Sequence, residues 1–210
     1  GGRLGAVGKA QPQLVGAGDR GLASDPSRVG MFRDSAELAM RYADILRPEK
    51  MNCLAGKLLP GVSRQDQLDT LRTNLRDAAD LAATHGVRLV MDPLNPFDAP
   101  GYLVATPDEG FAVIEQVNHP NLKVEYDIYH AQRTQGNMTS TLASRMPLIG
   151  HIQIADSPDR HEPGTGEINY PFVLQAIDDA GYDGCVSLEY KPRTDTASSL
   201  EWLRTMGYWG

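Results

Sequence analysis

The stretch Thr106–Asp127, TPDEGFAVIEQVNHPNLKVEYD, contains one helix–strand unit and indicates the fold class. Thr106-Pro107-Asp108-Glu109 has the form of a capping box with proline at the first helical position, which predicts a helix that runs to about Val117. The apolar run after it predicts a strand over Leu122–Asp127 that ends in a carboxylate.

The same unit recurs on both sides of this stretch. Upstream, helical spacing predicts a helix that ends at Pro48, and Ser63 can cap a second helix that Gly86 closes. The other predicted elements are strands over Lys50–Leu54, Val87–Asp92, Ile149–Ala155 and Gly184–Glu189, and helices near Thr139–Arg145, from Pro171 to Gly181 and over Ala197–Met206. Strands that alternate with helices indicate an α/β fold with a parallel sheet. Residues 1–25 are rich in glycine and lack a period, so we expect an irregular segment there and a single domain over residues 26–210.

Two architectures fit this alternation, an open doubly wound sheet and a (β/α) barrel. No Gly-rich dinucleotide fingerprint or phosphate-binding loop follows a predicted strand, which disfavours the open sheet. Four polar residues at strand ends favour the barrel: Asp92, Asp127, Gln153 and Glu189. Their separations of 35, 26 and 36 residues are close to the roughly 31 per unit of an eight-unit barrel of about 250 residues, where the four side chains would converge on one mouth.

The chemistry of these four residues suggests a metal site. Three carboxylates and one amide are hard oxygen ligands that suit Mg²⁺ or Mn²⁺. Without a cation the carboxylates would repel one another, unless some stay protonated. Taken singly, each could instead cap a helix or form an ion pair in a loop. His151 is the alternative to Gln153 as the residue of its strand that faces the mouth.

Further polar side chains follow the same strand ends. They are Asn95, His130, Arg160, His161, Glu162, Lys191 and Arg193. Barrel enzymes draw their chemistry from these loops, so the cations would offer an anionic substrate a binding site. A surface ion pair is the alternative role for Arg160 and Lys191. His85 and His119 lie near predicted helix ends and are interpreted as structural.

Composition excludes several classes of protein. The chain has 210 residues, Lys+Arg 20 against Asp+Glu 27, and a net charge of −7, so it lacks the basic surplus that a nucleic-acid-binding protein needs. No apolar run approaches the roughly 20 residues of a bilayer span, and no signal peptide pattern opens the chain. Cys53 and Cys185 lie in apolar runs, which predicts buried, reduced thiols in a cytoplasmic protein. Nothing in the sequence indicates the oligomeric state.

Five runs of residues resemble one known family. They are MNCLAGK at 51–57, YDIYH at 126–130, GHIQIAD at 150–156, DRHEPGTGEINY at 159–170 and EYKP at 189–192. These runs are similar to those of hydroxypyruvate isomerases, which are xylose-isomerase-like TIM barrels, and the resemblance covers about residues 17–203. The family's first two β/α units and much of the third have no counterpart in this chain, so we expect a barrel that is incomplete at its N-terminus.

The resemblance also implies roles for particular residues. Asp127, Gln153 and Glu189 stand where the family binds a divalent ion, and Glu189 pairs with the residue at 92 as acid and base. The family has Glu before Pro-x-Asn, whereas this chain has Asp92, one methylene shorter. Asp92 can still ligate the ion. His130, and Arg160 or His161, are the candidates to hold hydroxyl and carboxylate groups of the substrate.

The reaction that the resemblance implies is the interconversion of hydroxypyruvate and 2-hydroxy-3-oxopropanoate through a metal-stabilised enediolate. The substrate would be a small anionic hydroxy or keto acid. One alternative is an isomerase or epimerase of a larger keto acid or sugar, such as 2-oxo-tetronate. A truncated homologue that binds a ligand without turnover is the other.

Overall fold

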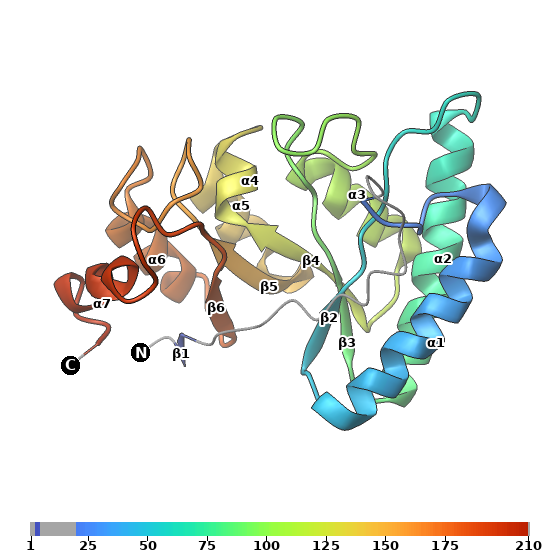
Figure 1. Ribbon diagram of the computed structural model, residues 1–210, viewed down its shortest axis with the longest axis horizontal. Helices are drawn as coiled ribbons and strands as arrows, with labels where there is room; N and C mark the ends of the chain where they lie inside the picture. The colour runs from blue at the N-terminus through green and yellow to red at the C-terminus, as the bar shows by residue number, and fades with distance from the viewer. Residues whose placement is uncertain (1–2, 5–19, 210) are drawn as a thin grey trace. The chain divides into compact units, whose positions relative to one another are not determined.

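The computed structural model describes residues 3–4 and 20–209 (Figure 1). The chain divides into two compact units, an N-terminal unit, Gly8–Glu125, and a C-terminal unit, Tyr126–Gly210 with Gly1–Val7. Most of the predicted irregular segment lies outside the described residues, whereas Leu22–Asp25 are buried in the N-terminal unit. The single domain that the sequence suggested stays a prediction.

The N-terminal unit alternates helices with parallel strands. Its elements are the 3-10 helix η1 (Pro26–Arg28), α1 (Val29–Leu46), β2 (Lys50–Asn52), α2 (Arg64–Thr84), β3 (Arg88–Met91), α3 (Pro107–Val117) and β4 (Leu122–Asp127), whose last two residues belong to the C-terminal unit. Strand β3 pairs in parallel with β2 and β4, with Met51 opposite Leu89 and Met91 opposite Val124. The long helices α1 and α2 lie side by side (Figure 1).

Local sequence signals account for these helix boundaries. Ser63 Oγ accepts a hydrogen bond from Asp66 N at 3.0 Å, and Thr106 Oγ1 accepts one from Glu109 N at 3.3 Å, so both predicted N-caps are confirmed. Gly86 follows α2 with φ of +69°, a conformation that favours glycine. Leu71 and Leu75 of α2 are fully buried in the core of the unit.

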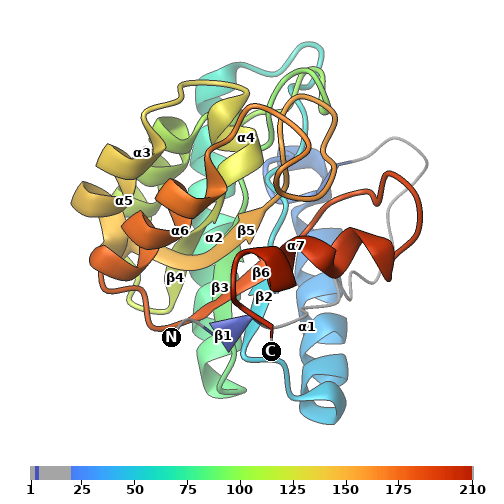
Figure 2. The same cartoon turned by 90° about the vertical axis from the view of Figure 1, so that its left-hand side faces the viewer.

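The C-terminal unit continues the alternation (Figure 2). Its elements are α4 (Ile128–Gln132), α5 (Met138–Arg145), the 3-10 helix η2 (Met146–Leu148), β5 (Ile149–Ile154), α6 (Tyr170–Asp179), β6 (Cys185–Leu188), the 3-10 helix η3 (Ser198–Leu200), α7 (Glu201–Thr205) and β1 (Arg3–Leu4). Strand β6 pairs in parallel with β5 and with β1. Every residue of β5 is buried, as expected of a strand covered on both faces.

The predicted strands are confirmed with ends that shift by one or two residues. Helix α4 was not predicted, and the last helix divides into η3 and α7. Cys53 and Cys185 are free thiols that are half-buried rather than fully buried. Among the helices of the described residues, none is both long and apolar enough to cross a membrane.

Candidate active site

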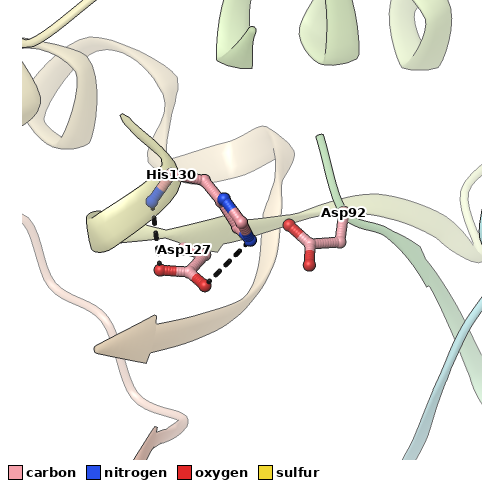
Figure 3. Close-up of side chains that lie close together, drawn as sticks. All are labelled: Asp92, Asp127 and His130. Atoms are coloured by element: carbon pink, nitrogen blue, oxygen red, sulfur yellow. Dashed lines mark hydrogen bonds and ion pairs between the residues drawn. The ribbon is translucent and has the colours of Figure 1, made fainter. Parts of the chain in front are cut away.

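Asp127 ends strand β4 and begins helix α4 in one step. Its Oδ1 atom accepts hydrogen bonds from the backbone N–H groups of Tyr129 at 2.8 Å and His130 at 3.4 Å, so the carboxylate caps the helix. This cap aims the other oxygen, Oδ2, at His130, whose Nε2 lies 3.6 Å away (Figure 3). Both side chains are almost fully buried. Capping is therefore compatible with a second role, because it occupies only one of the two oxygens.

Arg160 joins this aspartate to Glu189. A single guanidinium nitrogen, Nη2, lies 3.2 Å from Asp127 Oδ2 and 2.9 Å from Glu189 Oε2. The Nε–H group donates to the Glu189 carbonyl at 3.3 Å, and the guanidinium carbon lies 5.0 Å from the centre of the Tyr129 ring. The predicted ion pair of Arg160 exists, but it is partly buried and is made with two of the predicted metal ligands.

Asp156, which sequence reasoning did not single out, organises the loop that carries Arg160. Its carboxylate is buried and accepts five backbone N–H groups, which belong to Ser157, Gly164, Thr165, Gly166 and Ile168 at 2.8–3.1 Å. Its carbonyl also accepts from Arg160 N at 2.9 Å. The available signal was an aspartate directly after a strand and ahead of a Gly-x-Gly turn, where backbone donors need an acceptor.

Gln153 and His151 are both buried in β5, with 4% and 3% of their surfaces exposed. They are not alternatives, because residues two apart in a strand point to the same face. Gln153 Oε1 has no hydrogen-bond partner among the residues that the structure describes. An orphaned buried acceptor costs about 1–3 kcal/mol, so this oxygen calls for a cation or a donor.

His161 and Lys191, two of the predicted substrate-binding residues, contact each other instead. His161 Nδ1 lies 2.6 Å from the Lys191 carbonyl oxygen, and the Lys191 side chain is exposed. Lys191 N in turn donates to the Arg160 carbonyl at 2.7 Å. These bonds tie the loop to the segment after β6, whereas Arg160 reaches the carboxylates directly.

The N-terminal unit contains a pair of buried carboxylates of its own. Asp92 follows β3 and is fully buried, and Glu125 in β4 is 2% exposed. Carboxylate oxygens of the two lie within 4.8 Å of each other, and the register of Met91 with Val124 places the two residues on adjacent strands. Glu125 was not predicted from the sequence, although it lies two residues before Asp127 and therefore on the same face of β4.

Asn95 and Tyr102 belong to the loop that follows Asp92. Burial, and then the charge of Asp92, raise the pKa of Tyr102 well above its ordinary value, so this tyrosine is neutral. Asn95 Oδ1 accepts from Phe97 N and Asp98 N, both at 3.0 Å, and its Nδ2 donates to Asp98 Oδ2 at 3.2 Å. The Asn95 side chain thus holds a turn, and its role toward a substrate stays a prediction.

The two histidines that were interpreted as structural hold helix ends. His85 lies 2.7 Å from Asp44, and His119 lies 3.0 Å from Asp80. Both partners are exposed carboxylates on neighbouring helices. This arrangement agrees with the structural interpretation.

The donors in the C-terminal unit fit a divalent ion. Asp127 Oδ2 and Glu189 Oε2 already gather around one positive group, and Gln153 supplies a buried oxygen without a partner among the described residues. All three are hard oxygen donors at or after the carboxyl ends of strands, which suits Mg²⁺ or Mn²⁺ better than a metal that prefers sulfur.

Comparisons with known proteins place the chain among relatives. Residues 11–206 match the family described as xylose isomerase-like TIM barrel. A hydroxypyruvate isomerase of Escherichia coli is 44% identical over 89% of this chain and 72% of its own length. A 2-oxo-tetronate isomerase of Cupriavidus necator is 39% identical over 95% and 76%. A solved structure from Brucella melitensis, titled AP endonuclease, family 2, has a TM-score of 0.85 at 37% identity and covers 88% of this chain and 71% of its own.

Proposed function

This chain belongs to the xylose isomerase-like TIM barrel family and is an isomerase-type enzyme, and we propose that it interconverts hydroxypyruvate and 2-hydroxy-3-oxopropanoate. The predicted (β/α) barrel class and the resemblance to hydroxypyruvate isomerases are confirmed. The observation that carries the proposal is the meeting of Asp127 and Glu189 at one guanidinium, in a chain 44% identical to a protein of that name.

Asp127, Gln153 and Glu189 would hold a divalent ion, Mg²⁺ or Mn²⁺, which would polarise the substrate carbonyl and stabilise the charge of the enediolate. Glu189 removes the proton from the carbon next to the carbonyl, and Asp92 is the second acid/base group that the resemblance implies. Because the enediolate is formed by proton removal and consumed by proton return, two positioned carboxylates are sufficient for the chemistry.

Two side chains hold the substrate in this proposal. Arg160 pairs with its carboxylate, since a guanidinium forms charge-assisted bonds with carboxylates in a fixed geometry. His130, which is buried and oriented by Asp127, binds a hydroxyl group. Asn95, His161 and Lys191 lie in the loops at the strand ends and remain proposed secondary contacts.

A second substrate has support of its own. The relative named 2-oxo-tetronate isomerase is 39% identical and matches a larger share of this chain, 95%. That substrate has one more carbon and needs the same proton transfer, so both compounds belong in the first assay.

The test is whether the purified chain converts hydroxypyruvate, with the aldehyde product measured by NMR. Glu189→Gln should abolish conversion, and a chelator should stop it until Mg²⁺ or Mn²⁺ is restored. Glu201→Gln is the matched control, because Glu201 is exposed on α7 and pairs with Arg204 of the same helix at 3.5 Å. A folded protein without turnover on either substrate would refute the proposal.

A further inference from the structure

One cation of the protein itself stands among the proposed metal ligands. Arg160 Nη2 contacts an oxygen of Asp127 and an oxygen of Glu189 at 3.2 and 2.9 Å, whereas a Mg²⁺ ion requires such oxygens at about 2.0–2.1 Å. The two positive groups would compete for the same lone pairs at close range. A divalent ion bound to these oxygens would therefore repel the guanidinium from this position, since two cations would lie at close range.

The backbone of Arg160 is anchored independently of its guanidinium. Its N–H donates to the Asp156 carbonyl at 2.9 Å and its carbonyl accepts from Lys191 N at 2.7 Å. The residue has φ of +59°, a left-handed conformation that Asp156 and its five backbone bonds hold in place. A long side chain on a fixed backbone can leave the carboxylates by rotation of its own bonds, without movement of the loop.

Neighbouring groups would keep the Arg160 guanidinium near the site after it leaves the two carboxylates. The centre of the Tyr129 ring lies 5.0 Å from the Arg160 guanidinium carbon, a cation–π distance, so the ring attracts the guanidinium in addition to the two carboxylates. The Arg160 side chain is 20% exposed, so solvent and small anions reach it. Meanwhile Gln153 Oε1, buried and without a partner among the described residues, is a ligand that the guanidinium does not use.

We propose that Arg160 is an exchangeable counter-cation: it neutralises Asp127 and Glu189 in the metal-free protein, and a divalent ion displaces it to pair with the substrate's carboxylate. This inference rests on the proposed function for the nature of the substrate. Because the released guanidinium binds an anion and the ion binds the released state more tightly, each ligand strengthens the binding of the other by the same factor.

The experiment measures Mn²⁺ binding to the full chain by electron paramagnetic resonance of the free ion, with and without propionate as a carboxylate that chelates metal weakly. Arg160→Asn removes the competitor while asparagine tolerates the left-handed backbone. We expect it to bind Mn²⁺ about 10-fold more tightly than the wild type, within the 5–150-fold range usual for coupled sites. Propionate should tighten Mn²⁺ binding to the wild type and leave the variant unchanged.

Arg133→Gln is the matched control. Arg133 also lies over the Tyr129 ring, at 5.9 Å, and donates to the Pro158 carbonyl at 2.8 Å, so the control removes a second cation beside the same ring. Its Mn²⁺ affinity should equal that of the wild type. Arg160→Gly, which suits the same φ, replaces the asparagine variant if that protein does not fold.

Three outcomes would overturn the inference. They are equal or weaker Mn²⁺ binding by the Arg160 variants, no effect of propionate on Mn²⁺ binding by the wild type, and no Mn²⁺ binding by any of the proteins. These are binding measurements, so they are separable from turnover. Exchange without hydroxypyruvate conversion would reject the proposed function alone, and conversion without exchange would reject this inference alone.

Discussion

Asp156→Asn tests whether one buried carboxylate holds the loop that positions Arg160. The two carboxylate oxygens divide five backbone donors between them: Oδ1 accepts from Ser157 and Ile168, and Oδ2 accepts from Gly164, Thr165 and Gly166. A carboxamide has one oxygen, and its NH₂ group faces donors wherever it is placed. The substitution changes no volume, so its effect reports the hydrogen bonds.

The magnitude follows from which donors lose their acceptor. With the NH₂ group in the position of Oδ1, two N–H groups are orphaned, and in the position of Oδ2 three are. An orphaned buried donor costs about 1–3 kcal/mol, so the cheaper orientation costs about 2–6 kcal/mol if the loop keeps its shape. If the loop opens locally at a lower cost in free energy than the orphaned donors impose, the loss of stability is limited to the cost of that opening.

Hydrogen exchange of the peptide over residues 157–169 is the primary assay, with urea unfolding beside it. We expect faster exchange throughout that peptide and a free energy of unfolding that is lower by up to about 2–6 kcal/mol. Asp159→Asn, an exposed aspartate in the same loop, is the control and should leave both measurements unchanged. Wild-type exchange in Asp156→Asn would refute the assignment of Asp156 as the organising residue.

Three further predictions concern single residues. A Cβ at Gly166 would lie 2.0 Å from the Ser157 carbonyl oxygen, so Gly166→Ala should lower the free energy of unfolding in urea by about 1–3 kcal/mol; an unchanged midpoint would contradict it. Burial, followed by the charges of Asp127 and Asp156, raises the pKa of Tyr170, so the neutral hydroxyl stabilises the fold below pH 10, and that contribution is lost as the pH rises further. Tyr170→Phe removes the 2.6 Å hydrogen bond to the Ala155 carbonyl and should be about 1 kcal/mol less stable at pH 8. In urea unfolding, the difference in stability between wild type and variant should narrow above pH 10, and a constant difference would argue against the raised pKa. Asp92→Glu restores the longer carboxylate and should increase hydroxypyruvate turnover, whereas a lower kcat would show that this site is adapted to aspartate.

Much of the candidate site could be predicted because strand ends are visible in a sequence. The apolar runs that end at Asp92, Asp127 and Glu189 reflect local patterning and burial. Helix α4 escaped prediction because five residues are too few to show a helical period, and its start depends on the cap that Asp127 provides. Glu125 escaped prediction because the apolar residues around it indicate a strand but do not indicate that its own side chain is buried.

The sequence by itself determined the alternation of helices and strands, the caps at Ser63 and Thr106, and the oxygen donors at the strand ends, because these depend on neighbours within a few positions. Only the tertiary structure decided that Arg160 meets Asp127 and Glu189, which lie 33 and 29 residues away along the chain. It also decided that the His161 side chain contacts the Lys191 carbonyl. The physical reason is that the loop after β5 takes its shape from the buried Asp156 carboxylate, whose bonds reach up to 12 residues ahead, and no local pattern encodes where such a loop aims its side chains.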